Sequence, residues 1–122
     1  MARKPSKSSL QLKADSLWSQ VVRQQWGHCA ICGNPRTEAH HLIGRSRRAT
    51  RYEPMNGIAL CAKHHKFSTE LSAHGAPLAF AEWLQQCHPV IAAWVADNHR
   101  ATVDRVTVEW YQDKINKLTE LL

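Results

Sequence analysis

Apolar residues recur at helical spacing near both ends of this chain and lose that spacing in the middle. From Leu10 to Trp26 they form a stripe of positions three to four apart, which predicts a helix that ends at Gly27. The same spacing returns at Pro77 and predicts a helical tail over residues 77–122. Its helices are expected at 77–86, 89–98 and 103–122. The last of them places its apolar residues on one face: Val108, Tyr111, Ile115, Leu118 and Leu122.

Two short strands are expected in the central segment, residues 29–69. Thr37–Ile43 is one candidate, and Ile58–Leu60 is the other because it follows Asn56-Gly57, a strong turn signal. Between them, Gly44–Pro54 is expected to be a loop.

A helix from Cys61 to about Leu71 is expected after the second strand, with Phe67 and Leu71 facing the core because they are four positions apart. The predicted fold class is therefore α+β, with one domain over residues 10–122. Residues 1–9, MARKPSKSS, are expected to form a disordered basic arm that touches DNA backbone or, equally, a frayed terminus.

The charge of the chain is concentrated in the central segment. The 122 residues carry a formal net charge of +6, and residues 36–66 contain seven basic residues against two acidic ones. A local positive patch favours a polyanionic partner, and nucleic acid is the first candidate. No apolar run is long enough to span a membrane and no signal peptide is visible, so the bacterial cytosol is the expected compartment.

The cysteines of the central segment occur in pairs with metal-ligand spacing. Cys29-x2-Cys32 and Cys61-x2-His64 together supply four soft ligands, the number that a closed tetrahedral zinc site needs. The alternatives are disulfides, which suit an oxidising compartment, or free buried thiols. Cys87 has no partner two or three positions away and is expected to be a buried or inert thiol.

A second set of residues is interleaved with the first and is not needed for zinc. His40 and His41 are neighbours on a predicted strand, so their side chains would point to opposite sides, one to a metal and one to proton chemistry. His65 directly follows His64, and Asn56 has its own explanation as a turn residue. His74 lies in an expected loop, where a surface role is favoured over a ligand role.

The run AHHLIGR, followed by NGIALCAKHH, resembles the HNH nuclease family, whose fold is a ββα-metal finger. The resemblance covers residues 29–69, a third of the chain. It consists of His40-His41, an Asn fifteen positions after His41, and a His nine positions after that Asn. A looser resemblance to small HNH proteins of phages and prophages includes LWSQVVRQQWGHCAICG before the motif and the helical tail after it.

This resemblance implies a role for each matching residue. His41 corresponds to the general base that activates a water, and Asn56 corresponds to the asparagine that orients this base. His40 and His65 correspond to ligands of a catalytic divalent ion, expected to be Mg²⁺ or Mn²⁺. The structural zinc site of the family corresponds to Cys29, Cys32, Cys61 and His64.

The chain departs from the family pattern at two positions. His64 stands where many members have Cys, which is an acceptable exchange of zinc ligands. Thr69 stands where many members have a further His or Asn ligand, so fewer protein ligands are expected at the catalytic ion.

The expected function is that of a metal-dependent DNA endonuclease that hydrolyses phosphodiester bonds. Nicking of one strand and cleavage of both stay open, although a monomer would most simply nick. The arginines between the two halves of the motif are expected to contact phosphates, or else to form a solvated loop: Arg45, Arg47, Arg48 and Arg51. The phage resemblance suggests DNA-packaging or recombination proteins as partners, and the last helix could mediate a homodimer. The rival interpretations are a non-catalytic zinc-stabilised nucleic-acid-binding module and, more weakly, an interaction protein that works through its C-terminal helices.

Overall fold

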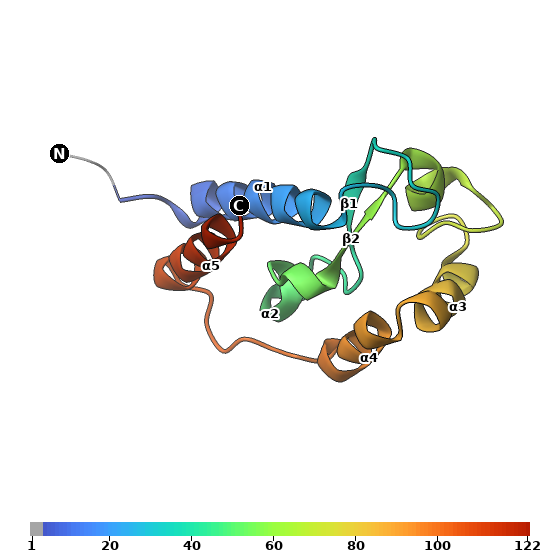
Figure 1. Ribbon diagram of the computed structural model, residues 1–122. Helices are drawn as coiled ribbons and strands as arrows, with labels where there is room; N and C mark the ends of the chain where they lie inside the picture. The colour runs from blue at the N-terminus through green and yellow to red at the C-terminus, as the bar shows by residue number, and fades with distance from the viewer. Residues whose placement is uncertain (1–3) are drawn as a thin grey trace.

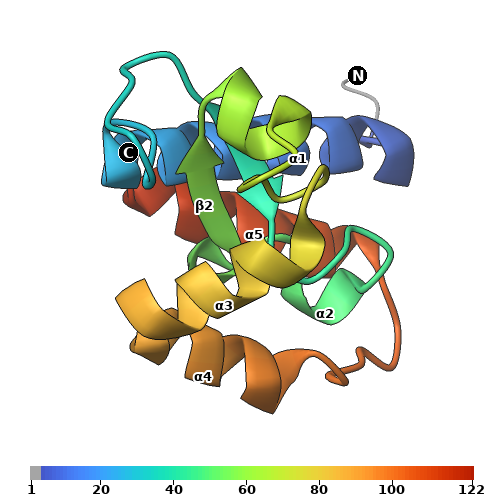
Figure 2. The same ribbon diagram turned by 90° about the vertical axis from the view of Figure 1, so that its right-hand side faces the viewer.

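The computed structural model describes residues 4–122 and is a small α+β protein, as the sequence predicts (Figures 1 and 2). Helices surround a two-stranded antiparallel sheet. In chain order the elements are α1 (Lys7–Trp26), β1 (Glu38–His41), α2 (Arg48–Arg51), the 3₁₀ turn η1 (Pro54–Asn56), β2 (Gly57–Leu60), the π-helical turn η2 (Lys63–Phe67), α3 (Pro77–Cys87), α4 (Pro89–Asn98) and α5 (Val108–Glu120).

The helix α1 begins three residues earlier than predicted. The Ser6 hydroxyl accepts a hydrogen bond from the Ser9 amide and so caps the first turn, while Gly27 closes the helix in the left-handed conformation with φ of 75°. Residues 7–9 of the predicted basic arm are therefore helical, and its residues 1–3 lie outside the described part of the chain.

The predicted apolar faces of α1 and α5 pack against each other on one side of the sheet (Figures 1 and 2). Their shared core contains Leu10, Ala14, Trp18, Val21, Val22, Tyr52, Tyr111, Ile115 and Leu118. Leu122, predicted to belong to this face, is 46% exposed because it lies beyond the end of α5. A second cluster joins β2 to α3 on the other side of the sheet, through Ile58, Leu60, Phe80 and Leu84.

The register of the sheet places the two strand histidines in its last two residue pairs. His40 pairs with Ile58 and His41 pairs with Gly57. At Gly57 the side chains of α1 come so close that an added Cβ would lie 2.2 Å from Val22 Cγ2 and 2.9 Å from the Trp18 ring. A glycine here lets α1 pack directly on the strand.

The segment after β2 departs most from the predicted structure. Instead of a helix from Cys61 to Leu71, the chain makes one π-helical turn and becomes extended at Ser68. Phe67 is consequently 73% exposed and does not face the core.

Two further predictions are corrected. The expected loop Gly44–Pro54 contains the short helix α2, and its last residue, Pro54, is the first residue of η1. Cys87, expected to be buried or inert, is an exposed free thiol at the end of α3.

Substitution of Gly57 by alanine should destabilise the protein by about 1–3 kcal/mol, because the new methyl group overpacks the contact with Val22 and Trp18. Gly44→Ala is the matched control, since a Cβ at Gly44 meets nothing within 4 Å. Urea denaturation monitored by tryptophan fluorescence measures both changes. Equal stability of the two variants would contradict the close approach of α1 to β2.

Candidate functional site

Three thiols and one imidazole meet where the turn after α1 approaches the end of β2. The ligand atoms of Cys29, Cys32, Cys61 and His64 all lie within 4.8 Å of one another. A glycine with φ of 78°, Gly33, closes the tight turn that brings the first two cysteines together, and the Ala30 amide donates to the Ala59 carbonyl of β2. The fold therefore brings together the two ligand pairs that the sequence predicts.

The separations within this Cys/His cluster fit a zinc ion. The Cys29 Sγ–His64 Nδ1, Cys32 Sγ–Cys61 Sγ and Cys61 Sγ–His64 Nδ1 distances are 3.8, 3.7 and 3.3 Å. Tetrahedral Zn–S and Zn–N bonds of about 2.3 and 2.0 Å separate neighbouring ligand atoms by about 3.5–3.8 Å. Burial disfavours the Cys29 thiolate, but hydrogen bonds from the backbone of residues 61, 32 and 31 outweigh it and lower the pKa of Cys29 to about 6. The cluster could therefore hold Zn²⁺.

A second group of nitrogen ligands lies beside the first and consists of His40, His65 and His74. Their ring nitrogens also fall within 4.8 Å of one another, and His65 Nε2 is 3.2 Å from His40 Nδ1. Tetrahedral or octahedral sites with metal–nitrogen bonds of about 2.1 Å place neighbouring nitrogens a similar distance apart, so this three-histidine cluster could hold a metal ion.

His74 is the member that the sequence prediction placed in a surface role. Its side chain is exposed, but its loop folds back on η2, because the His74 amide donates to the His65 carbonyl at 2.9 Å. Gly75 makes this return possible, since a Cβ there would lie 2.5 Å from the Ser68 carbonyl oxygen. A histidine next to a glycine, five positions after Thr69, where the resemblance predicts a ligand, was the available signal in the sequence.

Glu38 fixes the orientation of His65. The carboxylate lies 2.7 Å from His65 Nδ1, and because a carboxylate accepts, Nδ1 donates, which leaves Nε2 as the nitrogen that can bind a metal in the cluster. This hydrogen bond lowers the pKa of Glu38, and burial lowers the pKa of His40 to about 3. Neutral His40 at physiological pH is suited to binding a metal.

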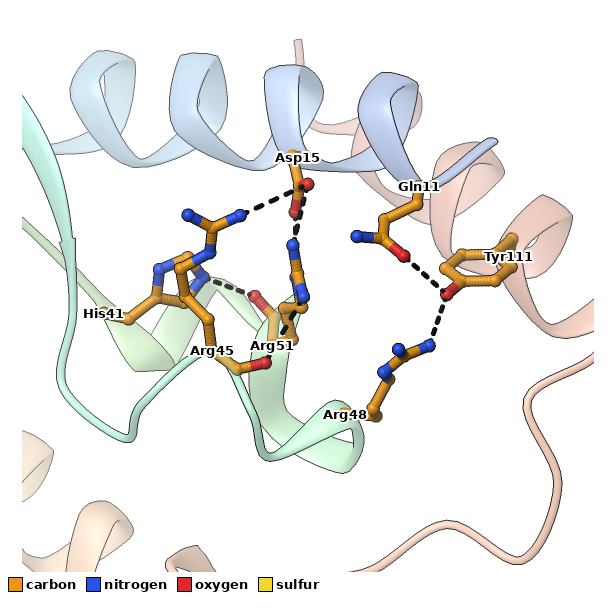
Figure 3. A network of polar contacts seen from close by, with 7 residues as sticks. All are labelled: Gln11, Asp15, His41, Arg45, Arg48, Arg51 and Tyr111. Carbon is orange, nitrogen blue, oxygen red and sulfur yellow. Dashed lines mark hydrogen bonds and ion pairs between the residues drawn. The ribbon is translucent and has the colours of Figure 1, made fainter. Parts of the chain in front are cut away.

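His41 points to the other side of β1, as neighbouring strand residues do, and is held by two contacts. Its Nε2 donates to the Arg51 carbonyl at 2.9 Å (Figure 3), and its ring stacks on the Trp18 indole with centroids 3.6 Å apart and planes 7° apart. Burial lowers the pKa of His41 to about 4, although the hydrogen bond to the Arg51 carbonyl acts in the opposite direction. At pH 7 the ring is therefore neutral, with its proton on Nε2 and its lone pair on Nδ1.

Asn56 is fully buried and acts on the loop after β1. Its Oδ1 accepts from the Ile43 amide at 2.6 Å, and its Nδ2 donates to the carbonyls of Ile43 and Thr50 at 3.0 and 3.1 Å. The side chain thus joins the two ends of the loop that leads from β1 to α2. The Asn56 carbonyl also accepts from the Leu42 amide at 2.9 Å, so Asn56 holds the backbone that directly follows His41.

The four arginines predicted to contact phosphate divide into two groups. The side chain of Arg45 is 66% exposed and Arg47 is exposed as well. Arg48 is exposed too, although one of its nitrogens donates to the Tyr111 hydroxyl (Figure 3). Arg51 is only 6% exposed. The exposed positions of Arg45, Arg47 and Arg48 are compatible with the predicted phosphate contact, whereas the guanidinium group of Arg51 is engaged within the protein.

A single cleft of about 510 Å³ contains both kinds of histidine. Its lining includes His41, the three-histidine cluster, and the cationic side chains Arg45 and Lys66. Lys66, on η2, was not among the predicted phosphate contacts. The cleft therefore combines a neutral imidazole, a candidate metal site and positive charge.

Comparison of the chain with models of protein families, with curated proteins and with solved structures found no match. Within residues 4–122, none of the helices combines the length and the apolar character that crossing a bilayer requires.

Replacement of Cys61 by serine should remove one zinc ion per chain and lower the melting temperature by roughly 10 °C or more, because zinc binding to such a site is coupled to folding. The matched control is Cys87→Ser, which changes an exposed thiol outside the Cys/His cluster. Zinc content by mass spectrometry and thermal unfolding measure both effects. Retention of zinc by Cys61→Ser would rule out the proposed ligand set.

Proposed function

We propose that this protein is a metal-dependent DNA endonuclease of the HNH type. The observation that carries the proposal is the shared cleft, in which neutral His41 and the three-histidine cluster line one cavity. A group that accepts a proton and a site for a divalent ion are the two parts that phosphodiester hydrolysis needs.

The arrangement of the elements supports an HNH-type ββα-metal finger. Two antiparallel strands are followed by the turn η2, with His40 and His41 on the first strand and His65 on the turn. Asn56 precedes the second strand and joins the ends of the intervening loop. These are the positions that the resemblance assigns to the motif, although the expected helix is reduced to one turn.

Two metal ions would have different functions in this protein. Zn²⁺ in the Cys/His cluster would stabilise the finger. Its four protein ligands would complete a tetrahedral site, so this ion would stay bound during catalysis. A second divalent ion would be held by His40, His65 and His74. Three neutral nitrogen ligands favour a transition-metal ion over Mg²⁺, so Mn²⁺ and its heavier neighbours are better candidates than Mg²⁺. When bound, this ion neutralises phosphate charge and stabilises the leaving oxygen.

The residues of the chain would carry out the proton transfer and the positioning. Nε2 of His41 is committed to the Arg51 carbonyl, which leaves Nδ1 to accept a proton from the attacking water. Arg45 and Lys66, both lining the cleft, would contact the phosphates around the scissile bond. Trp18 restricts rotation of the His41 ring by stacking on it.

DNA is the proposed substrate because Arg45 and Lys66 line the cleft against one acidic residue, Asp15, because residues 36–66 carry an excess of basic residues, and because of the HNH resemblance. A monomer that uses this cleft would nick one strand, and a homodimer could cut both. The looser resemblance suggests a phage or prophage protein that acts in the bacterial cytoplasm beside packaging or recombination proteins.

Replacement of His41 by alanine should lower the rate of plasmid nicking by about 10²–10⁴-fold, the usual contribution of a general base. His99→Ala is the control, since His99 is exposed at the end of α4 and its Nδ1 bonds only within that helix. Supercoiled DNA would be incubated with zinc-loaded protein and Mn²⁺, with and without EDTA. If the wild type shifts DNA on a gel but does not cleave it with any divalent ion, the protein is a zinc-stabilised binding module instead.

Replacement of His74 by alanine should weaken binding of the second ion by at least about tenfold, since even the loss of an outer contact to a metal ligand has effects of that size. Calorimetric titration of zinc-loaded protein with Co²⁺ measures this affinity, and His99→Ala again serves as the control. The zinc content of the Cys/His cluster should not change. Equal Co²⁺ affinity of wild type and His74→Ala would show that His74 is not a ligand.

A further inference from the structure

We infer that the ion pair between Asp15 and Arg51 is a positioning device for His41, in which a residue of α1 holds the carbonyl group that orients the ring. The inference rests on the proposed function for the role of His41, but the geometry on which it depends is independent of catalysis. It gives Arg51 a function different from the phosphate contact that the sequence predicts.

The ion pair between Asp15 and Arg51 has the two-pronged geometry that fixes both side chains. Arg51 Nε is 2.9 Å from one carboxylate oxygen of Asp15, and Nη2 is 2.9 Å from the other (Figure 3). Arg51 is 6% exposed, so water competes little for these hydrogen bonds. Its remaining nitrogen, Nη1, faces the Arg45 carbonyl at 3.4 Å. A buried guanidinium in this setting has no room to reach DNA.

The backbone of Arg51 connects this ion pair to His41. Arg51 is the last residue of α2, and the final carbonyl groups of a helix have no partner within the helix. Its carbonyl instead accepts the Nε2 proton of His41 at 2.9 Å. Because the side chain and the carbonyl belong to one residue, anchoring the guanidinium also restricts the position of the acceptor.

The face of α1 that carries Asp15 also contacts His41 directly. Trp18 lies three positions after Asp15, which places both side chains on one face of the helix. Trp18 stacks on the His41 ring and donates from Nε1 to the Glu53 carbonyl at 2.9 Å. One turn of α1 therefore contacts the ring directly and, through Arg51, sets the direction of its Nε2–H bond.

The opposite end of α2 has a separate anchor that provides a control. Arg48, the first residue of α2, donates to the Tyr111 hydroxyl of α5 at 2.7 Å, and that hydroxyl faces Gln11 at 3.4 Å (Figure 3). This contact also joins α2 to a helix, but it has no bond to His41. Removing it should change stability without changing the ring.

The test compares Asp15→Asn with Tyr111→Phe in zinc-loaded protein. Long-range ¹H–¹⁵N correlation spectra of the histidine rings report which nitrogen carries the proton. The wild type should show His41 with its proton on Nε2, and Tyr111→Phe should keep this pattern. Asp15→Asn should show a mixture of the two tautomers, because the acceptor carbonyl is no longer held. If Asp15→Asn does not fold, Arg51→Lys, which keeps the charge but loses the two-pronged bond, is measured instead.

Plasmid nicking gives a second, separable readout. In Asp15→Asn, kcat should fall about 10- to 100-fold with little change in KM, as expected when a catalytic group is misplaced but substrate binding is retained. An unchanged His41 tautomer in Asp15→Asn, or in Arg51→Lys where that variant replaces it, would overturn the inference, even if the wild type cleaves DNA. Absence of cleavage by the wild type would overturn the proposed function, while the spectra would still decide the role of the ion pair.

Discussion

The close approach of α1 to β2 at Gly57 is the constraint on which the rest of the structure depends. The missing side chain at Gly57 admits Val22 and the Trp18 ring to the surface of the strand. The same indole stacks on His41 and donates to the Glu53 carbonyl, so it belongs to the core and to the cleft at once. The geometry of the candidate base is therefore set by core packing and is as rigid as that packing allows.

The turn η2 brings the two candidate metal sites together in the fold. His64 belongs to the Cys/His cluster and His65 to the three-histidine cluster, although they are neighbours in the chain. A site of three cysteines and one histidine suits a permanent zinc ion, whereas three imidazoles suit an ion that can also bind substrate oxygens. This difference in ligands is the basis for proposing a structural role for the first site and a catalytic role for the second, in which Glu38 fixes the orientation of His65.

The parts of the fold that the sequence predicted are those determined by local patterns. The apolar stripe of α1, the prolines that open α3 and α4, and the paired spacing of the Cys/His cluster all depend on residues close in the chain. Contacts between distant residues decided the rest. The ion pair of Arg51 could not be foreseen because Asp15 lies 36 positions away. His74 is exposed as predicted, but its approach to His40 and His65 depends on a backbone hydrogen bond, invisible in the sequence, that returns its loop to η2. The short helix α2 is likewise held by side chains of α1 and α5 rather than by its own propensity.

The packing of α5 on α1 has a consequence for the order of folding. The contact between Gln11 and Tyr111 joins residues 100 positions apart, whereas the Cys29–His64 contact closes a loop of only 35. Because the entropy lost on closing a loop rises with its length, and distant contacts slow folding, we expect the segment that carries the Cys/His cluster to assemble first and α5 to pack on α1 afterwards. A chain between these two stages would hold α2 through Asp15 of α1 but not yet through Tyr111 of α5.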